Sequence, residues 1–404
     1  MDWLDELLVK RIGIFGGAFD PIHYGHLTAA EYARHSFNLD FILFIPTGEP
    51  PHKDTITFNE HRYLMTLLAT EDNPKFYVSR LELDRPGESY TVDTLRYLKE
   101  KTAAELFFII GADATVKTWK EAEKLPQLCQ FIKVTRPGYT AENAIEIPGI
   151  DISGTTLRER VRTGQPIKYL LPPAVEKYIH DMQLYKSADK AEKSEVPNEV
   201  QNETQGEVQG EVQDEIAEIY TAIAAQISEK RFRHTLGVVQ TAVLLASQYG
   251  ENFYNAHIAA IFHDYAKEYN NNDMLNLCQK FEIPLDEIQQ QVPNIMHGAV
   301  AAQLARRNFN ITAKNILCAI ANHTIPKPPL SLLDKIIKIA DNTEPNRQNF
   351  SGQITLDELR KLSKIDLNKA TISAIIGDME YTKRKGQILH PQSTEVLQYL
   401  QKEG

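Results

Sequence analysis

The stretch GIFGGAFDPIHYGHL, from Gly13 to Leu27, decides the fold of the first half of the chain. It opens within an apolar run that is typical of a buried strand, and Gly16 and Gly17 let the backbone turn sharply where that strand ends. A helix that begins directly after such a loop presents unpaired N–H groups and a positive dipole end to an anion. The stretch therefore predicts a strand, a glycine loop and a helix that bind a triphosphate.

Two histidines follow the glycine loop. His23 and His26 are three residues apart in the pattern H-x-G-H, so a helix can place both on the face that meets the loop. Their ring N–H groups are suited to bind the charge that develops on a departing pyrophosphate. Gly25, which has no side chain, leaves room for a nucleotide between them. The pair predicts a catalytic site for chemistry at a phosphorus centre.

Outward from this stretch, apolar runs alternate with helix-like segments. The expected strands are RIGIFGG, FILFIP, FYVSRLEL, LFFIIGAD and FIKVTRP, and the expected helices lie around residues 26–38, 60–71 and 91–101. Strands that alternate with helices are typical of a parallel sheet covered on both faces. We therefore expect an α/β doubly wound, Rossmann-like domain with a parallel sheet over residues 1–186.

The composition changes after residue 186. Residues 187–213 contain no aromatic residue and end in QGEV-like repeats, which predicts a disordered acidic linker, with a solvated helix as the alternative. Beyond the linker, apolar residues recur at helical spacing over 216–227, 235–249, 256–268, 311–323 and 331–341. This pattern predicts an all-α domain over residues 214–404.

The bulk composition limits the class of protein. A chain of 404 residues is longer than one core usually supports, and 42% apolar with 24% charged residues is typical of globular domains. Residues 187–215 hold nine acids and two bases, so they account for most of the net charge of −10 and the rest of the chain is nearly neutral. No basic stripe in the sequence suggests a nucleic-acid partner. The sequence has no apolar run of about 20 residues, and its three cysteines form no CxxC pair. The apolar run near Met1 is too short and too interrupted to predict a signal peptide. We expect a cytoplasmic protein without a membrane partner; homo-oligomer formation stays open.

The helical half holds the residue types that bind divalent metals. They are spread over about a hundred residues with no short spacing among them: His234, His263, Asp264, His297, His323 and Asp341. Imidazole and carboxylate groups are ligands for a cation that activates water against a phosphorus centre. His263 and Asp264 are adjacent, so they are able to flank a metal pair or to bind one ion. Lys267, four residues after His263, is a candidate phosphate ligand on the same face.

Four further segments accompany the H-x-G-H pattern. GGAFDPIHYGH resembles the signature of the nucleotidyl transferase superfamily, and FIPTGEPPHK, RPGESYTVDTL, FFIIGAD and ISGTTLRERV resemble bacterial nicotinate-nucleotide adenylyltransferases over roughly residues 11–185. The resemblance implies adenylyl transfer from ATP, bound with Mg²⁺, to nicotinate mononucleotide, which gives deamido-NAD and pyrophosphate. Nicotinamide mononucleotide is the alternative acceptor. A pantetheine-phosphate adenylyltransferase is a rival that RPGESYTVDTL disfavours.

The resemblance assigns roles to the first site. The catalytic residues would be His23, His26 and Arg158. Ser153 opens the S-x-x-x-x-R element that Arg158 closes, and a helix N-terminus with a guanidinium would hold the ATP phosphates there. Gly154 stands where the family more often has a hydroxyl residue. Asp113, at the carboxyl end of a strand, would accept hydrogen bonds from ribose hydroxyls.

Other positions would complete the nucleotide site. Trp119 would stack on the pyridine ring, with ordinary packing as the alternative. Thr91 marks the backbone that would receive the nicotinate carboxylate, and Lys53 is a phosphate contact. Gly16, Gly17 and Phe19 belong to the glycine loop that would bind the nucleotide.

The second half carries its own resemblance. RFRHTLGVVQTAVLLA, AAIFHDYAKEY, IMHGAVAAQLA, AIANHT and SLLDKIIKIADNTEPNR resemble the HD-superfamily symmetrical diadenosine tetraphosphate hydrolases over roughly residues 214–404. The core metal ligands would be His234, His263, Asp264 and Asp341. His297 and His323 would complete a second metal position or contact phosphate, and Lys267 and Arg347 would bind phosphate.

The implied reaction is attack of a metal-activated water on the tetraphosphate, which gives two molecules of ADP. Asp264 and Lys267 are the catalytic candidates, and the expected cofactor is a divalent transition metal, iron or manganese. One alternative is a nucleotide sensor that regulates the transferase. Another is hydrolysis of a different phosphorylated nucleotide, such as an alarmone or a monophosphate.

Overall fold

A computed structural model describes residues 10–50, 57–135, 144–147, 152–186 and 211–403. The chain divides into two compact units, Met1–Gln213 and Asp214–Gly404. Lys53 and most of the expected linker lie outside the described residues.

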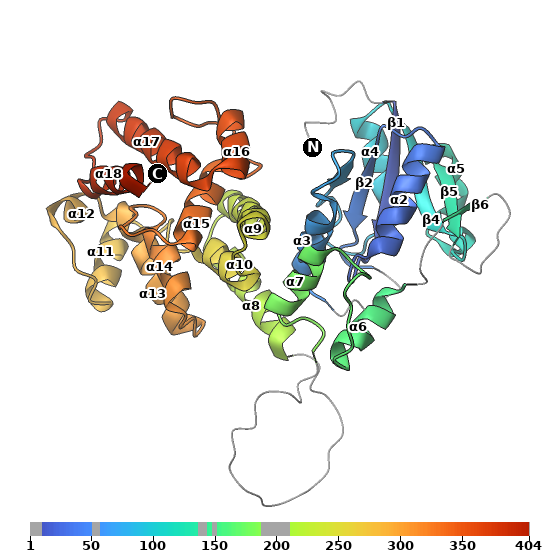
Figure 1. The fold of residues 1–404 in the computed structure, drawn as a ribbon, viewed down its shortest axis with the longest axis horizontal. Coiled ribbons are helices and arrows are strands. Elements are labelled where there is room, and N and C mark those ends of the chain that lie inside the picture. Colours follow the sequence, from blue (N-terminus) through green and yellow to red (C-terminus); the bar gives the residue numbers. More distant parts are fainter. Residues whose placement is uncertain (1–9, 51–56, 136–143, 148–151, 187–210, 404) are drawn as a thin grey trace, which may run out of the picture. The chain divides into compact units, whose positions relative to one another are not determined.

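The first unit is built on a six-stranded sheet in which every neighbouring pair is parallel (Figure 1). The strand order is β3-β2-β1-β4-β5-β6. The strands are β1 (Arg11–Gly17), β2 (Phe41–Pro46), β3 (Phe76–Val78), β4 (Glu105–Gly111), β5 (Gln130–Thr135) and β6 (Ala144–Glu146). The order reverses direction between β1 and β4, which is where doubly wound folds bind ligands. The expected α/β class is confirmed.

Helices flank this sheet. They are α2 (Tyr24–Ser36), α3 (Asn59–Thr70), α4 (Thr91–Lys101), α5 (Leu125–Leu128), α6 (Gly154–Arg162) and α7 (Pro173–Asp181), with 3₁₀ turns at Val116–Thr118 and Ala122–Lys124. Ile12 and Ile14, alternate residues of β1, are buried in one cluster with Val92 and Leu95 of α4. Because alternate strand residues point to one face, this cluster forms the core between α4 and the sheet.

One expected strand is shorter than its apolar run suggests. FYVSRLEL predicts a long strand, but β3 ends at Val78. The hydroxyl of Ser79 accepts a hydrogen bond from the backbone N–H of Leu81 at 3.1 Å, and the N–H of Asp84 donates to the backbone oxygen of Arg80 at 2.9 Å. These local bonds turn the chain, so the apolar residues beyond Val78 do not extend the sheet.

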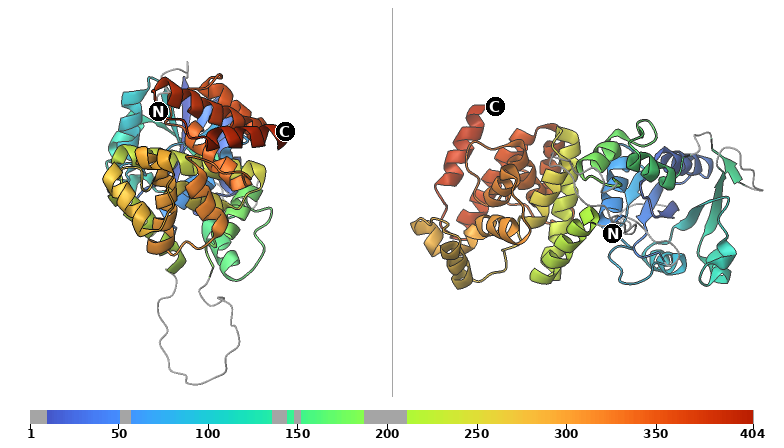
Figure 2. Two further views of the ribbon diagram at one scale, coloured as in Figure 1. Left: turned by 90° about the vertical axis from the view of Figure 1, so that its left-hand side faces the viewer. Right: turned by 90° about the horizontal axis from the view of Figure 1, so that it is seen from below.

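The described residues of the second unit form helices and no strands, which confirms the expected all-α class (Figure 2). They are α8 (Glu211–Gln226), α9 (Glu229–Tyr249), α10 (Phe253–Phe262), α11 (Asn271–Lys280), α12 (Glu287–Gln291), a 3₁₀ turn (Pro293–Met296), α13 (His297–Asn308), α14 (Lys314–Asn322), α15 (Leu332–Thr343), α16 (Leu356–Ile365), α17 (Leu367–Arg384) and α18 (Gln392–Glu403). Helix α8 begins at Glu211, inside the segment expected as linker. The Glu and Gln residues at its start are good helix formers, so the helix extends beyond the apolar residues toward the N-terminus. No helix within the described ranges has the length and apolar character needed to cross a membrane.

Helices α9, α10 and α15 pack against one another and form the centre of the second unit. Val239 and Val243 of α9, Ile258 of α10, and Ile336 and Ile337 of α15 are all buried. The fixed spacing of these apolar residues sets how each helix is rotated about its axis. It therefore also sets where the polar residues on the same helices meet.

Candidate functional sites

A cavity of about 900 Å³ lies at the carboxyl ends of the central strands of the first unit. Its walls include Gly16 and Gly17 at the end of β1, Gly111 at the end of β4 and Thr135 at the end of β5. The first turns of α2 and α6 also line it. Two helix N-termini at one cavity present N–H groups and positive dipole ends to a shared ligand, so the cavity suits a phosphate chain.

His23 and His26 lie in the cavity wall with their rings stacked. The ring centroids are 3.8 Å apart and the ring planes differ by 27°. The backbone N–H of His23 donates to Nδ1 of His26 at 3.3 Å, which leaves the proton of the neutral His26 ring on Nε2. Phe19 packs edge-on against His26, with centroids 5.1 Å apart. The structure thus brings the two imidazoles together beside the glycine loop.

Residues from distant parts of the unit hold the loop between β1 and α2. Arg158 of α6 donates to the backbone oxygen of Asp20 at 2.7 Å, and the Tyr185 hydroxyl donates to the Asp20 carboxylate at 2.6 Å. Arg62 of α3, only 1% exposed, donates to the backbone oxygen of Ala18 at 2.9 Å. Sequence reasoning identified Arg158 but missed Arg62 and Tyr185. The one available signal was a charged residue at a core-facing position of helix 59–70.

The same loop gives a reason for Gly154. A Cβ atom at this position would lie 2.7 Å from the backbone oxygen of Asp20, closer than real Cβ atoms approach. Ser153, the preceding residue, caps α6 by accepting a hydrogen bond from the N–H of Thr156 at 3.1 Å. The absence of a side chain at Gly154 therefore lets the N-terminus of α6 and the glycine loop approach each other closely.

The remaining candidates of the first site divide into two sets. Asp113, Ser153 and Phe19 line the cavity. Thr91, the first residue of α4, and Trp119 are not among its lining residues. Trp119 packs against Phe108 and Phe131, with ring centroids 6.0 and 6.3 Å away. Stacking of Trp119 on a pyridine ring and receipt of a carboxylate near Thr91 stay predictions, as does the phosphate contact of Lys53.

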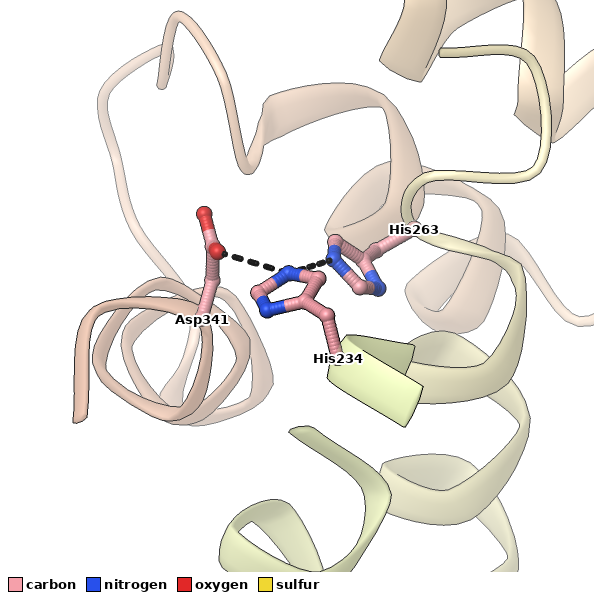
Figure 3. A group of neighbouring side chains, drawn as sticks. All are labelled: His234, His263 and Asp341. Carbon is pink, nitrogen blue, oxygen red and sulfur yellow. Dashed lines mark hydrogen bonds and ion pairs between the residues drawn. The ribbon is translucent and has the colours of Figure 1, made fainter. Parts of the chain in front are cut away.

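In the second unit, the six expected metal ligands gather into two groups of three. The first group is His234, His263 and Asp341, and the second is Asp264, His297 and His323. In the first group, Nε2 of His234 lies 3.3 Å from Nε2 of His263 and 3.3 Å from Oδ1 of Asp341 (Figure 3). These side chains come from α9, α15 and the end of α10.

Asp264 links the two groups. Its Oδ1 atom lies 3.1 Å from Nε2 of His297 and 3.6 Å from Nε2 of His323, within the second group. Its Oδ2 atom lies 3.5 Å from Nε2 of His263 and 3.7 Å from Nε2 of His234, within the first group. One carboxylate thus faces both groups, an arrangement suited to a pair of neighbouring cations.

The far ring nitrogens fix how the imidazoles are oriented. Nδ1 of His263, His297 and His323 each donates to a backbone oxygen three residues earlier, at 2.7 Å in every case. Nδ1 of His234 instead donates to the carboxylate of Glu344 at 3.2 Å. A histidine that donates through Nδ1 turns Nε2 toward the ligand group, and in the neutral rings of His263 and His297 this leaves Nε2 free of a proton to bind a metal. Sequence reasoning missed Glu344.

The electrostatic surroundings differ between the histidines. Burial lowers the pKa of His263 to about 4, and burial together with the Lys267 ammonium lowers the pKa of His297 to about 4. Burial opposes the charge on His234, but the carboxylates of Asp341 and Glu344 raise its pKa to about 9. His263 and His297 are therefore neutral and ready to bind a metal, whereas His234 would release a proton on binding.

Three cationic side chains surround the ligand groups. Nζ of Lys267 lies 3.2 Å from Nε2 of His297, and Arg347 approaches Asp341 at 3.9 Å. Arg231 forms a 2.6 Å ion pair with Asp264 and was not identified from the sequence. Guanidinium and ammonium groups beside a cation site are suited to hold the phosphate oxygens of a substrate.

Gly237 provides a test of how Glu344 supports the first group. A Cβ atom on Gly237 would lie 2.3 Å from Oε2 of Glu344, whose side chain is buried. We expect Gly237→Ala to displace this carboxylate from His234 and to weaken Mn²⁺ binding about 10- to 100-fold, measured by calorimetry. Gly386→Ala is the control, because it strains a position with φ of 65° but meets no atom within 4 Å. The control should lower stability without weakening Mn²⁺ binding; equal Mn²⁺ affinities in both variants would contradict this role of Glu344.

Two family models match separate parts of this chain. Residues 14–160 match the cytidylyltransferase-like family model, and residues 231–346 match the HD domain model. A solved structure described as a predicted HD superfamily hydrolase involved in NAD metabolism, from Clostridium acetobutylicum, has 34% sequence identity and a TM-score of 0.45. The matched region covers 47% of this chain and 98% of the chain in that structure.

Curated relatives match the first unit. A "probable nicotinate-nucleotide adenylyltransferase" of Thermoanaerobacter sp. (strain X514) is 47% identical over 205 residues, which span 45% of this chain and 96% of the relative. A protein of the same description from Thermus thermophilus is 50% identical over 185 residues, which span 44% of this chain and 100% of the relative. Because the relatives are matched over nearly their whole length at this identity, the chain belongs to the nicotinate-nucleotide adenylyltransferase family, and an HD domain follows the part that it shares with that family.

Proposed function

We propose that the first unit transfers the adenylyl group of ATP to nicotinate mononucleotide, forming deamido-NAD and pyrophosphate in NAD biosynthesis. The observation that carries this proposal is the stacked pair of His23 and His26 beside the glycine loop, in a cavity of about 900 Å³. The description of the relatives, which are 47% identical over 205 residues and 50% identical over 185 residues, names the same activity.

In this reaction, a phosphate oxygen of nicotinate mononucleotide attacks the α-phosphorus of ATP, and the bond to the β-phosphate oxygen breaks. The N–H groups at the starts of α2 and α6 would hold the phosphates in line. His23, His26 and Arg158 would stabilise the charge on the departing pyrophosphate, and Asp113 would orient a ribose. Mg²⁺ bound with ATP would neutralise further phosphate charge. No protein nucleophile is required.

The choice of acceptor is tested by product analysis. The full-length protein is incubated with ATP, Mg²⁺ and either nicotinate mononucleotide or nicotinamide mononucleotide, and the dinucleotides are separated by chromatography. We expect deamido-NAD to form much faster than NAD. Faster formation of NAD would overturn the acceptor assignment, and absence of both products would overturn the transferase itself.

We infer that the HD unit hydrolyses diadenosine tetraphosphate symmetrically into two molecules of ADP with a divalent transition metal, iron or manganese. The observation that supports this inference is the pair of ligand groups joined by Asp264. Four imidazoles that present Nε2, together with two carboxylates, match the ligand preference of such ions. All four rings are held by hydrogen bonds at Nδ1 that keep them oriented.

When bound, divalent ions lower the pKa of a water molecule and neutralise phosphate charge. The chain's own residues would position the substrate. Arg231, Lys267 and Arg347 lie around the ligand groups, where they would bind the oxygens of a polyphosphate. The first group is the more exposed, with side-chain exposures of 13% for His234 and 19% for Asp341, so substrate would approach from that side.

The substrate is tested with a panel of diadenosine tetraphosphate, an alarmone and nucleoside monophosphates, with Mn²⁺ or with a chelator. We expect ADP as the only product of diadenosine tetraphosphate, and no cleavage in chelator. Release of AMP and ATP would overturn symmetrical cleavage, and faster cleavage of another nucleotide would overturn the substrate assignment. Nucleotide binding without any cleavage would overturn the hydrolase in favour of a sensor that regulates the transferase.

A further inference from the structure

The HD match ends at residue 346, but the helices that follow it contact the segments that hold both ligand groups. Helices α16 and α17 pack against α15, the helix that carries Asp341 (Figure 1). Two side-chain contacts, one from each of these helices, reach the segments that hold the metal ligands. Each contact belongs to a different group.

The first contact is made by Arg360 of α16. Its Nε atom donates to the backbone oxygen of Thr343 at 3.1 Å, and Nη2 donates to the backbone oxygens of Glu344 at 2.9 Å and Arg347 at 3.1 Å. These oxygens belong to the end of α15 and the turn after it. A guanidinium is a planar set of five donors, so it fixes the three oxygens relative to one another.

The turn held by Arg360 is the one that orients His234. From this turn, the Glu344 carboxylate accepts from Nδ1 of His234, and its second oxygen accepts from the N–H of Asn346 at 2.7 Å. A shift of the turn therefore moves the carboxylate that sets the direction of the His234 ring. Arg360 touches no ligand itself and acts through Glu344.

The second contact joins α17 to His323. Lys338 of α15, 4% exposed, donates from Nζ to the backbone oxygen of His323 at 3.0 Å. The same Nζ forms a 2.5 Å ion pair with Asp378 of α17. A buried ammonium needs a partner to offset its desolvation, so Asp378 holds the Lys338 side chain in place behind the ligand.

We propose that α16 and α17 form a two-part brace for the metal centre. Arg360 positions the first group (His234, His263 and Asp341), and the pair of Lys338 and Asp378 positions the second group (Asp264, His297 and His323). All three are positioning residues outside the ligand set. The proposal rests on the proposed function only in that the two groups bind metal. It requires that each half of the brace affects its own group.

The test measures Mn²⁺ binding to the metal-free full-length protein by calorimetry and metal analysis. Single-group backgrounds separate the sites: His297→Ala leaves the first group, and His234→Ala leaves the second. In the His297→Ala background, Arg360→Gln should weaken Mn²⁺ binding about tenfold or more, and Lys338→Met should not. In the His234→Ala background, the pattern should reverse. Arg306→Gln, an exposed arginine of α13, is the control and should change neither.

Melting of the metal-free protein and the transferase rate of the first unit report general damage. If both substitutions weaken both groups equally and lower the metal-free melting temperature, the residues have only a structural role and the brace is overturned. If the wild type binds Mn²⁺ in both groups and neither substitution changes it, the brace is also overturned while the proposed metal dependence stands. A wild type that binds no Mn²⁺ would instead overturn the proposed function of the second unit.

Discussion

His23→Ala should lower the rate of deamido-NAD synthesis about 10²- to 10³-fold, because it removes a donor to the departing pyrophosphate. His23 stacks on His26 at 3.8 Å between ring centroids, so the loss also removes the neighbour that keeps the second ring in place. The rate is measured as pyrophosphate release at saturating ATP and nicotinate mononucleotide. Hydrolysis by the HD unit, whose ligands are all in the other half of the chain, should not change.

A matched control for this variant exists on the same helix. His35, in the last turn of α2, is exposed, so His35→Ala makes the same chemical change away from the cavity. It should retain the wild-type rate of synthesis. Equal rates in the two variants would contradict the catalytic role of His23. Loss of both enzyme activities in His23→Ala would contradict independent sites.

Asp264→Asn should abolish tight metal binding in both ligand groups and lower hydrolysis of diadenosine tetraphosphate about 10³-fold or more, since metal activation contributes several kcal/mol. The reason is that one carboxylate faces both groups, with Oδ1 directed to His297 and Oδ2 to His263. Asparagine keeps the shape but removes the charge and one ligand oxygen. Metal content and hydrolysis rate are measured on the same sample.

Asp273→Asn serves as the control for this charge removal. Asp273 lies exposed in the first turn of α11, outside both groups. It should keep the metal content and hydrolysis rate of the wild type. If the Asp264→Asn variant still binds two metal ions per chain, the shared carboxylate is not needed for metal binding. The transferase rate, expected to be unchanged in both variants, reports whether the protein is intact.

The first site was largely predictable because its residues are close together in the sequence. The glycine loop, His23 and His26 fall within one strand, loop and helix, and these local elements dictate their arrangement. Arg62 and Tyr185 were not predictable, since their hydrogen bonds to the loop join residues that lie far apart along the chain. A lone arginine or tyrosine in a helix or near a domain end carries no signal of such a contact.

For the second site, residue types and the HD resemblance predicted six candidate ligands, which the structure brings together, but not how they divide into two groups. The HD resemblance implies a core set of Asp264 with His234, His263 and Asp341, whereas the two oxygens of Asp264 face different groups in the structure. That division depends on how α9, α10 and α15 pack, which apolar periodicity alone does not determine. The supporting contacts of Glu344 and Arg360 depend on the same packing.

The hydroxyl of Tyr185 holds the carboxylate of Asp20 across 165 residues of chain. During synthesis at about 5–20 residues per second, the ribosome therefore releases the histidine loop roughly 10–30 s before the residue that anchors it. A nascent chain that ends before Tyr185 would contain His23 and His26 but would lack the hydrogen bond from Tyr185 to Asp20. Adenylyl transfer should thus begin only once the last segment of the first unit has emerged, before the HD unit has been translated.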